Sequence, residues 1–310
     1  MTSPLVSICC ICYNQEQYIR QTLEGFVEQK TTFPYEIIVS DDCSTDRTSD
    51  IINEYKIKYP GLFRDVSPSY NIGYIENWWY VQRCSHAKYI AMCEGDDFWI
   101  DVYKLQKQID ILECHPEYSM CVTNRKVLLN DGTYYIDVQD WKLKDNKDVL
   151  RGFIPHTQTL VYRNSESKLR DCDCIRLTTS KGGGDRALAW HVSKYGEIYN
   201  LPDVTAVYRL GCGLFGASVD DPQLELNKIN SYVDFQHQIL IPDRKIYVES
   251  LSKFCLNYLY YSYKRKIHNE IPYAKKSFLL WRKELSTYER IRYMLLFIKS
   301  KIIKRGNSVL

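Results

Sequence analysis

The sequence of 310 residues predicts an α/β fold in which a mostly parallel, Rossmann-like sheet is flanked by helices. Short continuous apolar runs recur in the first half of the chain, and such runs are typical of strands buried on both faces of a parallel sheet. Longer segments with apolar residues at helical spacing lie between them, which is the pattern of βαβ units. Near residue 221 the sequence becomes helical, aromatic and basic, so we predict a domain at 1–220 and a helical extension at 221–310.

The chain begins with one strand and one helix. Val6–Cys12 is an apolar run and predicts the first strand. A helix follows, with Ile19 and Leu23 one turn apart on its apolar face. Asn14 lies between the two elements and, with Gln17 three residues later, predicts a capping box at the start of the helix.

The second strand is predicted at Glu36–Ser40, before a helix that carries Ile51 and Tyr55 on one face. Asp42 follows the strand and allows two interpretations. It can accept a hydrogen bond from a nucleotide base or ribose hydroxyl, or it can form an N-cap or Asx turn before the helix. The residues alone favour neither.

Three carboxylates follow the next apolar run, Tyr89–Cys93. Glu94, Asp96 and Asp97 surround Gly95, and a like charge nearby disfavours the ionisation of each acid. A divalent cation reverses that effect, and carboxylate oxygens suit Mg²⁺ or Mn²⁺. An acidic, solvated loop is the alternative, but three acids directly after a buried strand favour a metal site.

These strand ends predict an active site. In open parallel sheets ligands bind beyond the carboxyl ends of the strands, so we expect Tyr13–Asn14, Asp41–Asp42 and Glu94–Asp97 to share one crevice. Neither G-x-G-x-x-G nor G-x-x-x-x-G-K-[ST] follows the first strand, where a dinucleotide site or a P-loop would carry its motif. A nucleotide at this crevice would therefore be held by its base and ribose rather than by a glycine-rich phosphate cradle.

The middle of the chain continues the alternation. Asn71–Gly73 is a turn, Asn77–Val81 is predicted to start a helix, and a further helix carries Leu105 on its apolar face. Tyr118–Thr123 predicts a strand, and Asn130–Thr133 predicts a hairpin turn.

Phe153–Tyr162 is predicted as a strand with polar tips, where His156 and Thr157 could touch a substrate, although a lone histidine is more often structural. Asp185 follows a run of three glycines and begins a helix. It can be an N-cap or a general base delivered by a flexible loop, and these residues alone favour the cap.

Two short strands are predicted at Tyr199–Pro202 and Thr205–Arg209. Arg209 precedes a glycine-rich segment, so it is a candidate phosphate clamp. A surface ion-pair residue is the equally ordinary alternative.

Composition excludes several classes of protein. A net charge of +3 is too small to indicate nucleic-acid binding. The N-terminus lacks the pattern of a signal peptide, and no apolar run is long enough to span a bilayer. Twelve cysteines in a chain without a secretion signal argue for reduced thiols, and most of them lie within apolar runs as small core residues, so we expect a cytoplasmic protein.

The C-terminal segment 289–305 combines an apolar face with basic residues. This pattern suits a helix that lies on an anionic membrane surface at the inner face of the membrane. A helix packed on its own domain or on a partner, with solvated lysines, is the alternative.

Several of these segments together resemble family 2 glycosyltransferases of the GT-A fold. Val6–Asn14 is similar to the first strand and turn of that family, and Asp41–Asp46 resembles its D-D-x-S-x-D segment. Asn71–Gly73 resembles its N-x-G turn, and Glu94–Asp97 its D-x-D region. Weaker similarity extends through Gly184–Leu188 to about residue 215, and the C-terminal third carries no motif of the family.

The resemblance implies a nucleotide-sugar donor, usually a UDP-sugar, a divalent cation (Mn²⁺ or Mg²⁺) and inversion at the anomeric carbon. Tyr13, Asn14 and Asp42 would then hold uracil and ribose. Asp185 would be the base that deprotonates the acceptor hydroxyl, so the resemblance favours the base over the cap. The full donor set that the resemblance implies is Tyr13, Asn14, Asp42, Asn71, Asp96 and Arg209, and the metal set is Asp96 with Glu94 and Asp97 beside it.

Two positions depart from the family pattern. Glu94 stands where the first Asp of D-x-D is usual, so its side chain would orient a ligand rather than bind the metal. Tyr70 stands where a basic residue is common, which weakens a phosphate contact at that turn.

We therefore expect a metal-dependent inverting glycosyltransferase that moves a hexosyl or N-acetylhexosaminyl group to a glycan or lipid-linked acceptor in surface-glycan or polysaccharide biosynthesis. A sugar-1-phosphate nucleotidyltransferase would need a basic, glycine-rich loop after the first strand, and Cys12–Gln15 is neither. A non-catalytic partner or membrane-docking protein is the third alternative, and the presence of all the acids argues against it.

Overall fold

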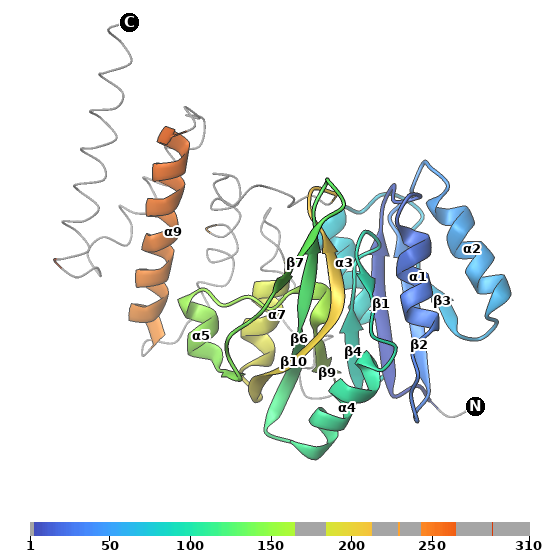
Figure 1. The fold of residues 1–310 in the computed structure, drawn as a ribbon, viewed down its shortest axis with the longest axis horizontal. Coiled ribbons are helices and arrows are strands. Elements are labelled where there is room, and N and C mark those ends of the chain that lie inside the picture. The colour runs from blue at the N-terminus through green and yellow to red at the C-terminus, as the bar shows by residue number, and fades with distance from the viewer. Residues whose placement is uncertain (1–2, 165–183, 213–228, 230–242, 265–286, 288–310) are drawn as a thin grey trace, which may run out of the picture. The chain divides into compact units, whose positions relative to one another are not determined.

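The computed structural model describes residues 3–164, 184–212, 229, 243–264 and 287 (Figure 1). The chain divides into two compact units. The first comprises residues 1–149, 154–176 and 184–216, and the second comprises 150–153, 177–183 and 217–310. The predicted division into 1–220 and 221–310 stays a prediction.

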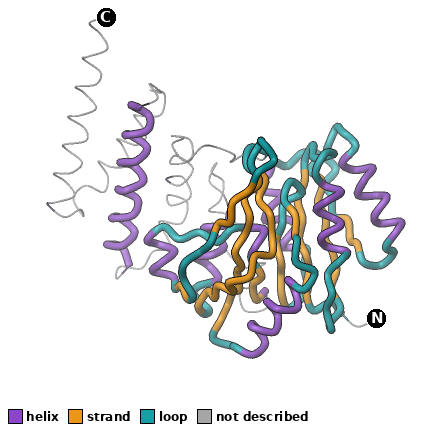
Figure 2. The backbone as a smooth tube through the Cα atoms, viewed as in Figure 1, coloured by secondary structure: helices purple, strands orange, loops and turns teal. Residues whose placement is uncertain are grey.

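The first unit is built on one ten-stranded sheet (Figure 2). Its central path runs in the order β3-β2-β1-β4-β9-β6-β10-β5, with β7 paired to β6 and β8 paired to β10. The strands are β1 (Val6–Cys12), β2 (Tyr35–Asp41), β3 (Phe63–Asp65), β4 (Tyr89–Met92), β5 (Phe98–Trp99), β6 (Tyr118–Leu128), β7 (Tyr134–Asp137), β8 (Leu143–Lys144), β9 (Val161–Arg163) and β10 (Glu197–Arg209).

The sheet consists of two parallel blocks joined by an antiparallel strand. The strands β3, β2, β1 and β4 are parallel to one another, as the βαβ pattern predicts. A second parallel pair joins β6 to β10. Between the blocks, β9 runs antiparallel to both β4 and β6. The predicted α/β class is confirmed, while the antiparallel strands make the sheet mixed.

Helices cover the sheet on both faces. The helical elements among the described residues are α1 (Ile19–Val27), α2 (Thr48–Lys58), α3 (Tyr74–Arg83), α4 (Lys104–Cys114), α5 (Asn146–Arg151), η1 (Thr157–Thr159), α7 (Gly184–Val192) and α9 (Arg244–Lys264), of which α9 belongs to the second unit. All seven residues of β1 are buried. Its even-numbered side chains pack with apolar residues of α1, α2 and α4 in one core, and α3 packs against β1 and β2. Burying each large apolar side chain stabilises this core by roughly 1.5–3 kcal/mol.

Three predicted elements differ in the structure. The capping box at Asn14 is wrong, because α1 begins at Ile19 after Tyr18 and no side chain caps it. The strand predicted at Phe153–Tyr162 is an extended segment, the short helix η1 and then β9. The two strands predicted between residues 199 and 209 form the single strand β10, in which register shifts on either side of Val204 interrupt the pairing with β6.

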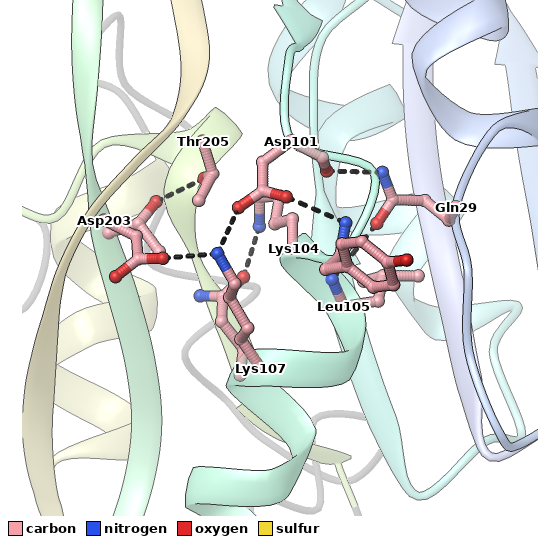
Figure 3. A network of polar contacts seen from close by, with 10 residues as sticks. Gln29, Asp101, Lys104, Leu105, Lys107, Asp203 and Thr205 are labelled. Carbon is pink, nitrogen blue, oxygen red and sulfur yellow. Dashed lines mark hydrogen bonds and ion pairs between the residues drawn. The ribbon is translucent and has the colours of Figure 1, made fainter.

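A polar network ties α4 to the neighbouring elements (Figure 3). Lys107 Nζ donates to Asp101 Oδ2 at 2.7 Å and to Asp203 Oδ2 at 2.5 Å, so it links the start of α4 to β10. Gln29 Nε2 donates to Asp101 O, and Leu105 N donates to Gln29 Oε1. These contacts fix α4 against the helix and strand on either side of it.

Of the second unit the structure describes α9 and a few further residues. The inward side chains of α9 include Tyr247, Leu251, Cys255 and Tyr258, which are almost fully buried. The segment 289–305, predicted to lie on a membrane, is outside the described residues. In the described ranges, no helix combines the length and apolarity needed to cross a bilayer.

Candidate active site

The predicted meeting of strand ends is present in the structure. β1 lies between β2 and β4, with Cys12 opposite Asp41. Gly95 N donates to Ile11 O at 2.9 Å, and Asp42 N donates to Cys12 O at 2.9 Å. The turns after β1, β2 and β4 therefore lie side by side at the carboxyl edge of the sheet.

Asn14 joins the turn after β1 to the loop after β2. Its backbone is in the left-handed region, with φ of 51°, which asparagine tolerates better than most residues. Its Oδ1 accepts a hydrogen bond from Thr45 N at 2.8 Å, and its own N–H donates to Ser44 Oγ at 2.8 Å. Tyr13 beside it is 48% exposed, so its ring is available to a ligand.

Asp42 holds the turn that precedes α3. Its buried carboxylate accepts hydrogen bonds from Ile72 N at 2.7 Å and from Gly73 N at 2.9 Å. Asn71 Nδ2 donates to the backbone carbonyl of Asp42 at 2.9 Å. Asp42 is therefore not the N-cap of α2, which is Arg47. A carboxylate has about four acceptor positions, so two backbone donors leave capacity for a ligand.

The acidic turn is buried and anchored from β10. Asp97 Oδ1 accepts a hydrogen bond from Arg209 N at 2.9 Å. The Arg209 guanidinium donates to the backbone carbonyl of Asp96 and to Gln21 Oε1, and it lies over the rings of Phe98 and Tyr18. Arg209, whose role as a phosphate clamp stays a prediction, supports this turn.

Gly95 is required at this turn because no side chain fits. A Cβ atom at this position would lie 2.4 Å from Gln15 Oε1 and 2.9 Å from Cys12 Cβ. Gln15 Oε1 is itself buried and has no hydrogen-bond partner among the described residues. The glycine lets the turn approach β1 closely enough to place Asp96 and Asp97 beside it.

Burial of these acids changes their ionisation. Burial raises the pKa of Glu94 to about 8, and the charges of Asp96 and Asp185 add to the rise. Burial also raises the pKa of Asp96, and it raises the pKa of Asp97 well above its usual range. A group of acids with raised pKa values at a buried site is a frequent sign of a functional site.

Asp185 lies in the first turn of α7, as predicted. Its Oδ1 accepts a hydrogen bond from Arg186 N at 2.8 Å, so it does contact the first turn of the helix. Burial raises the pKa of this carboxyl, and the Arg186 charge opposes the rise. The charge of Asp185 also adds to the rise in the pKa of Glu94 in the acidic turn.

The donor set fits a divalent cation only in part. Among the described residues, no three His, Cys, Asp or Glu side chains are grouped so as to hold a metal ion by themselves. Mg²⁺ and Mn²⁺ are commonly held by one or two carboxylates together with substrate phosphates. The buried carboxylates of the acidic turn suit that arrangement, in which the substrate completes the coordination.

Two residues at this site, Arg125 and Tyr208, were missed as candidates from the sequence, whereas Thr157 was expected there to touch a substrate. Thr157 in η1 donates a hydrogen bond to the Glu94 carboxylate, a contact that the sequence raised only in general terms. Arg125 on β6 acts electrostatically on Asp97 and Asp185. Tyr208 on β10 feels the charges of the acidic turn, and burial raises its pKa to about 12. The polar residues that follow Thr123 were the available signal, because β6 continues through them.

Comparison with known sequences identifies one family. The model described as glycosyl transferase family 2 matches residues 7–168. An uncharacterized protein of Mycobacterium tuberculosis is 39% identical over 212 residues, which cover 66% of this chain and 58% of that protein. The Escherichia coli UDP-Glc:alpha-D-GlcNAc-diphosphoundecaprenol beta-1,3-glucosyltransferase WfaP is 33% identical over 133 residues, 43% of this chain and 47% of that protein. The chain therefore spans less than two thirds of the length of these relatives.

Solved structures share the fold. S. aureus TarS, in complex with UDP-GlcNAc, superposes with a TM-score of 0.58 at 16% identity, covering 92% of this chain and 91% of that one. The mannosyltransferase PcManGT from Pyrobaculum calidifontis, in complex with GDP-Man and Mn²⁺, has a TM-score of 0.58 at 15% identity, covering 97% and 81%. At these identities the likeness shows the fold alone.

Proposed function

Because the chain belongs to glycosyl transferase family 2, we propose that it moves a sugar from a nucleotide-sugar, first of all a UDP-sugar, to an acceptor hydroxyl with inversion at the anomeric carbon. The observation that supports this most strongly is the burial of four carboxyl groups, Glu94, Asp96, Asp97 and Asp185, which raises the pKa of each. The charge of Asp185 adds to the rise in the pKa of Glu94, which supports a site that the expected base shares with the acidic turn.

Asp185 is the proposed general base. Inversion in one step needs a carboxylate on the side of the sugar opposite the leaving group, where it removes the proton of the attacking hydroxyl. Burial raises the pKa of Asp185, and a higher pKa makes the carboxylate a stronger base near neutral pH. The Asp185 carboxylate would carry the acceptor proton at the end of the step.

The nucleoside is proposed to bind at the turns after β1 and β2. Asp42 and Asn71 are held together there, and Tyr13 offers an exposed ring next to Asn14. TarS and PcManGT were solved with UDP-GlcNAc and GDP-Man, which is consistent with a nucleotide-sugar donor for this chain.

Asp96, with Glu94 and Asp97 beside it, is proposed to hold Mn²⁺ or Mg²⁺ together with the donor diphosphate. The cation would neutralise the negative charge that develops on the diphosphate as the glycosidic bond breaks. Arg209 is proposed to keep the turn in position through Asp96 and Asp97. The complex of PcManGT contains Mn²⁺, in line with this assignment.

The acceptor is proposed to be a glycan or lipid-linked sugar of a surface polysaccharide, with transfer of a hexosyl or N-acetylhexosaminyl group. The name of WfaP gives a diphosphoundecaprenol-linked acceptor for that protein. A reaction on such an acceptor would take place at the cytoplasmic face of the membrane.

Thermal unfolding tests the donor site. We would heat the wild type, Asp96→Asn and Asp185→Asn with UDP, GDP, CDP or dTDP, each with and without Mn²⁺. A ligand that binds only the folded state raises its stability, by about 2.7 kcal/mol at a hundredfold excess over Kd. We expect one diphosphate to stabilise the wild type in a metal-dependent way and Asp96→Asn to lose that shift.

Asp185→Asn separates binding from chemistry. It should keep the shift with the same diphosphate and Mn²⁺, while its transfer rate should fall about 10²- to 10⁴-fold, the usual contribution of a general base. A wild type that none of the four diphosphates stabilises would contradict the proposed function.

A further inference from the structure

A cation outside the expected donor set acts electrostatically on the carboxylates of the site. Arg125 on β6 opposes the rise in pKa of both Asp97 and Asp185. Its side chain is only 15% exposed. Arg125 lies over the ring of Tyr208, and the next residue of β10, Arg209, donates its amide to Asp97, so the guanidinium lies near the acidic turn.

The Arg125 guanidinium is fixed on two sides. Its Nε donates to Asp137 Oδ2 at 3.0 Å, and its Cζ lies 4.6 Å from the ring centroid of Tyr208. A planar guanidinium stacked on an aromatic ring and tied at one nitrogen has lost most of its rotational freedom before any ligand arrives.

A histidine supports the carboxylate that holds Arg125. His156 Nε2 lies 3.2 Å from Asp137 Oδ2. The hydrogen bond with His156, together with the Arg125 charge, lowers the pKa of Asp137 to about 2. Asp137 therefore stays charged throughout the physiological range. His156 immediately precedes Thr157, whose hydroxyl contacts Glu94, so this support also reaches the acidic turn.

The terminal nitrogens of Arg125 are available. Within the ranges that the structure describes, Nη1 and Nη2 have no hydrogen-bond partner, whereas both terminal nitrogens of Arg209 are engaged. A fork of this kind matches the oxygens of a phosphate group, with two parallel N–H donors.

We propose that Arg125 binds a phosphate group of a substrate, with Asp137 and His156 as positioning residues that hold its guanidinium in place. This inference rests on the proposed function, since it assigns the contact to that same site. The phosphate can come from the diphosphate of the donor or from a phosphate-bearing acceptor.

Calorimetric titration distinguishes the two sources. The ligands are the diphosphate selected by the unfolding screen, its nucleoside, and inorganic pyrophosphate added to protein already saturated with the diphosphate and Mn²⁺. The variants are Arg125→Gln and Arg125→Lys. Arg20→Gln is the matched control, because Arg20 is an exposed arginine of α1 paired with Glu54.

If the donor supplies the phosphate, Arg125→Gln should weaken diphosphate binding about 10- to 100-fold, as for the loss of a charged hydrogen bond, and should leave nucleoside binding unchanged. Arg125→Lys should recover only part of the loss. If the acceptor supplies it, diphosphate binding stays normal and pyrophosphate binds the saturated wild type but not Arg125→Gln.

The same titration tests the positioning role of His156. His156→Gln keeps an N–H donor near Asp137, so it should bind the phosphate ligand identified above with the affinity of the wild type. His156→Ala removes that donor and should bind the same ligand more weakly. Equal affinities of wild type and Arg125→Gln for both the diphosphate and pyrophosphate would overturn the proposal while leaving the proposed function intact. A wild type that binds no diphosphate at all would instead overturn the proposed function.

Discussion

At the scale of single residues, Lys104 is a costly side chain in the core, because a cation is buried there. It is fully buried on α4, and its Nζ donates to Gln108 Oε1 and Thr159 O and lies 4.5 Å from the ring centroid of Trp99. None of these partners carries a negative charge. Burial accordingly lowers the pKa of Lys104 from its ordinary value of 10.5 to about 7.

Lys104 should make stability depend on pH. Between pH 7 and 10 the unfolded chain binds a proton that the folded chain lacks, so stability should rise with pH by at most about 1.4 kcal/mol per unit from this group. The destabilisation is full below pH 7 and disappears as pH approaches 10.5. Lys104→Met should flatten that rise and stabilise the protein at pH 7 by about 1–3 kcal/mol, measured by urea unfolding.

Lys56→Met is the control for this prediction, because Lys56 lies at the surface and pairs with Asp65. Its unfolding should keep the pH dependence of the wild type. If Lys104→Met and Lys56→Met show the same dependence as the wild type, Lys104 is charged at pH 7 without cost and the prediction is wrong.

The residue types of the site were predictable, while most of their partners were not. Acids after buried strands indicate a metal or ligand site because their burial is costly without compensation. The partner of Asp97, however, is the amide of Arg209, 112 residues further along the chain. Asp42 likewise binds amides some 30 residues away. Contacts between residues so far apart in the chain depend on how the helices and strands pack, and the order of residues within one short segment does not reveal that packing.

At the scale of elements, the position of α7 determines where Asp185 lies. Gly184, the first residue of the helix, approaches α3 so closely that a Cβ atom would lie 2.6 Å from Trp78 Cε3. The Trp78 side chain is buried and packs edge-on against Trp79, so it has little room to move.

Gly184→Ala should therefore displace the start of α7. Overpacking of this kind costs roughly 1–3 kcal/mol of stability. Because a displacement of about 1 Å can cost on the order of 100-fold in rate, we expect a larger loss of transfer rate than of donor affinity. Trp78→Leu in the same chain should recover part of the rate by making room. A double variant no faster than Gly184→Ala alone would show that the clash with Trp78 is not the cause.

Secondary structure was predicted correctly where the apolar pattern of the sequence was continuous. β1, β2 and β4 were predictable because only a strand covered on both faces buries every side chain of a continuous apolar run. The pattern of segment 153–162 is weaker, because polar residues separate its apolar ends, and only Val161 and Tyr162 of it lie in a strand. In the part before that strand, Trp99 Nε1 and Gln108 Nε2 donate to the carbonyls of Gln158 and Thr159. Side chains from elsewhere in the fold thus replace the ladder that a strand would need.

At the scale of the whole molecule, the segment 289–305 is proposed to hold the protein at an anionic membrane. Deleting it should abolish sedimentation with liposomes that contain anionic lipid, because its basic residues are attracted to that surface and its apolar face enters the interface. Zwitterionic liposomes are the control for charge. The thermal shift with the diphosphate and Mn²⁺ should persist, which shows that the deleted chain is folded. Continued sedimentation of that chain would mean that membrane attachment lies elsewhere or is absent.

The antiparallel strand β9 separates the two parallel blocks of the sheet, which carry different parts of the proposed site. The block β3-β2-β1-β4 carries the turns proposed for the nucleoside, and the β6–β10 pair carries Arg125 and Tyr208. β9 pairs with β4 through three residues and with β6 through two. If one block were replaced by the same block of another family member, few pairings between strands would therefore have to be preserved. A chimera joined at this seam should keep the nucleotide preference of its first half and take the acceptor preference of its second.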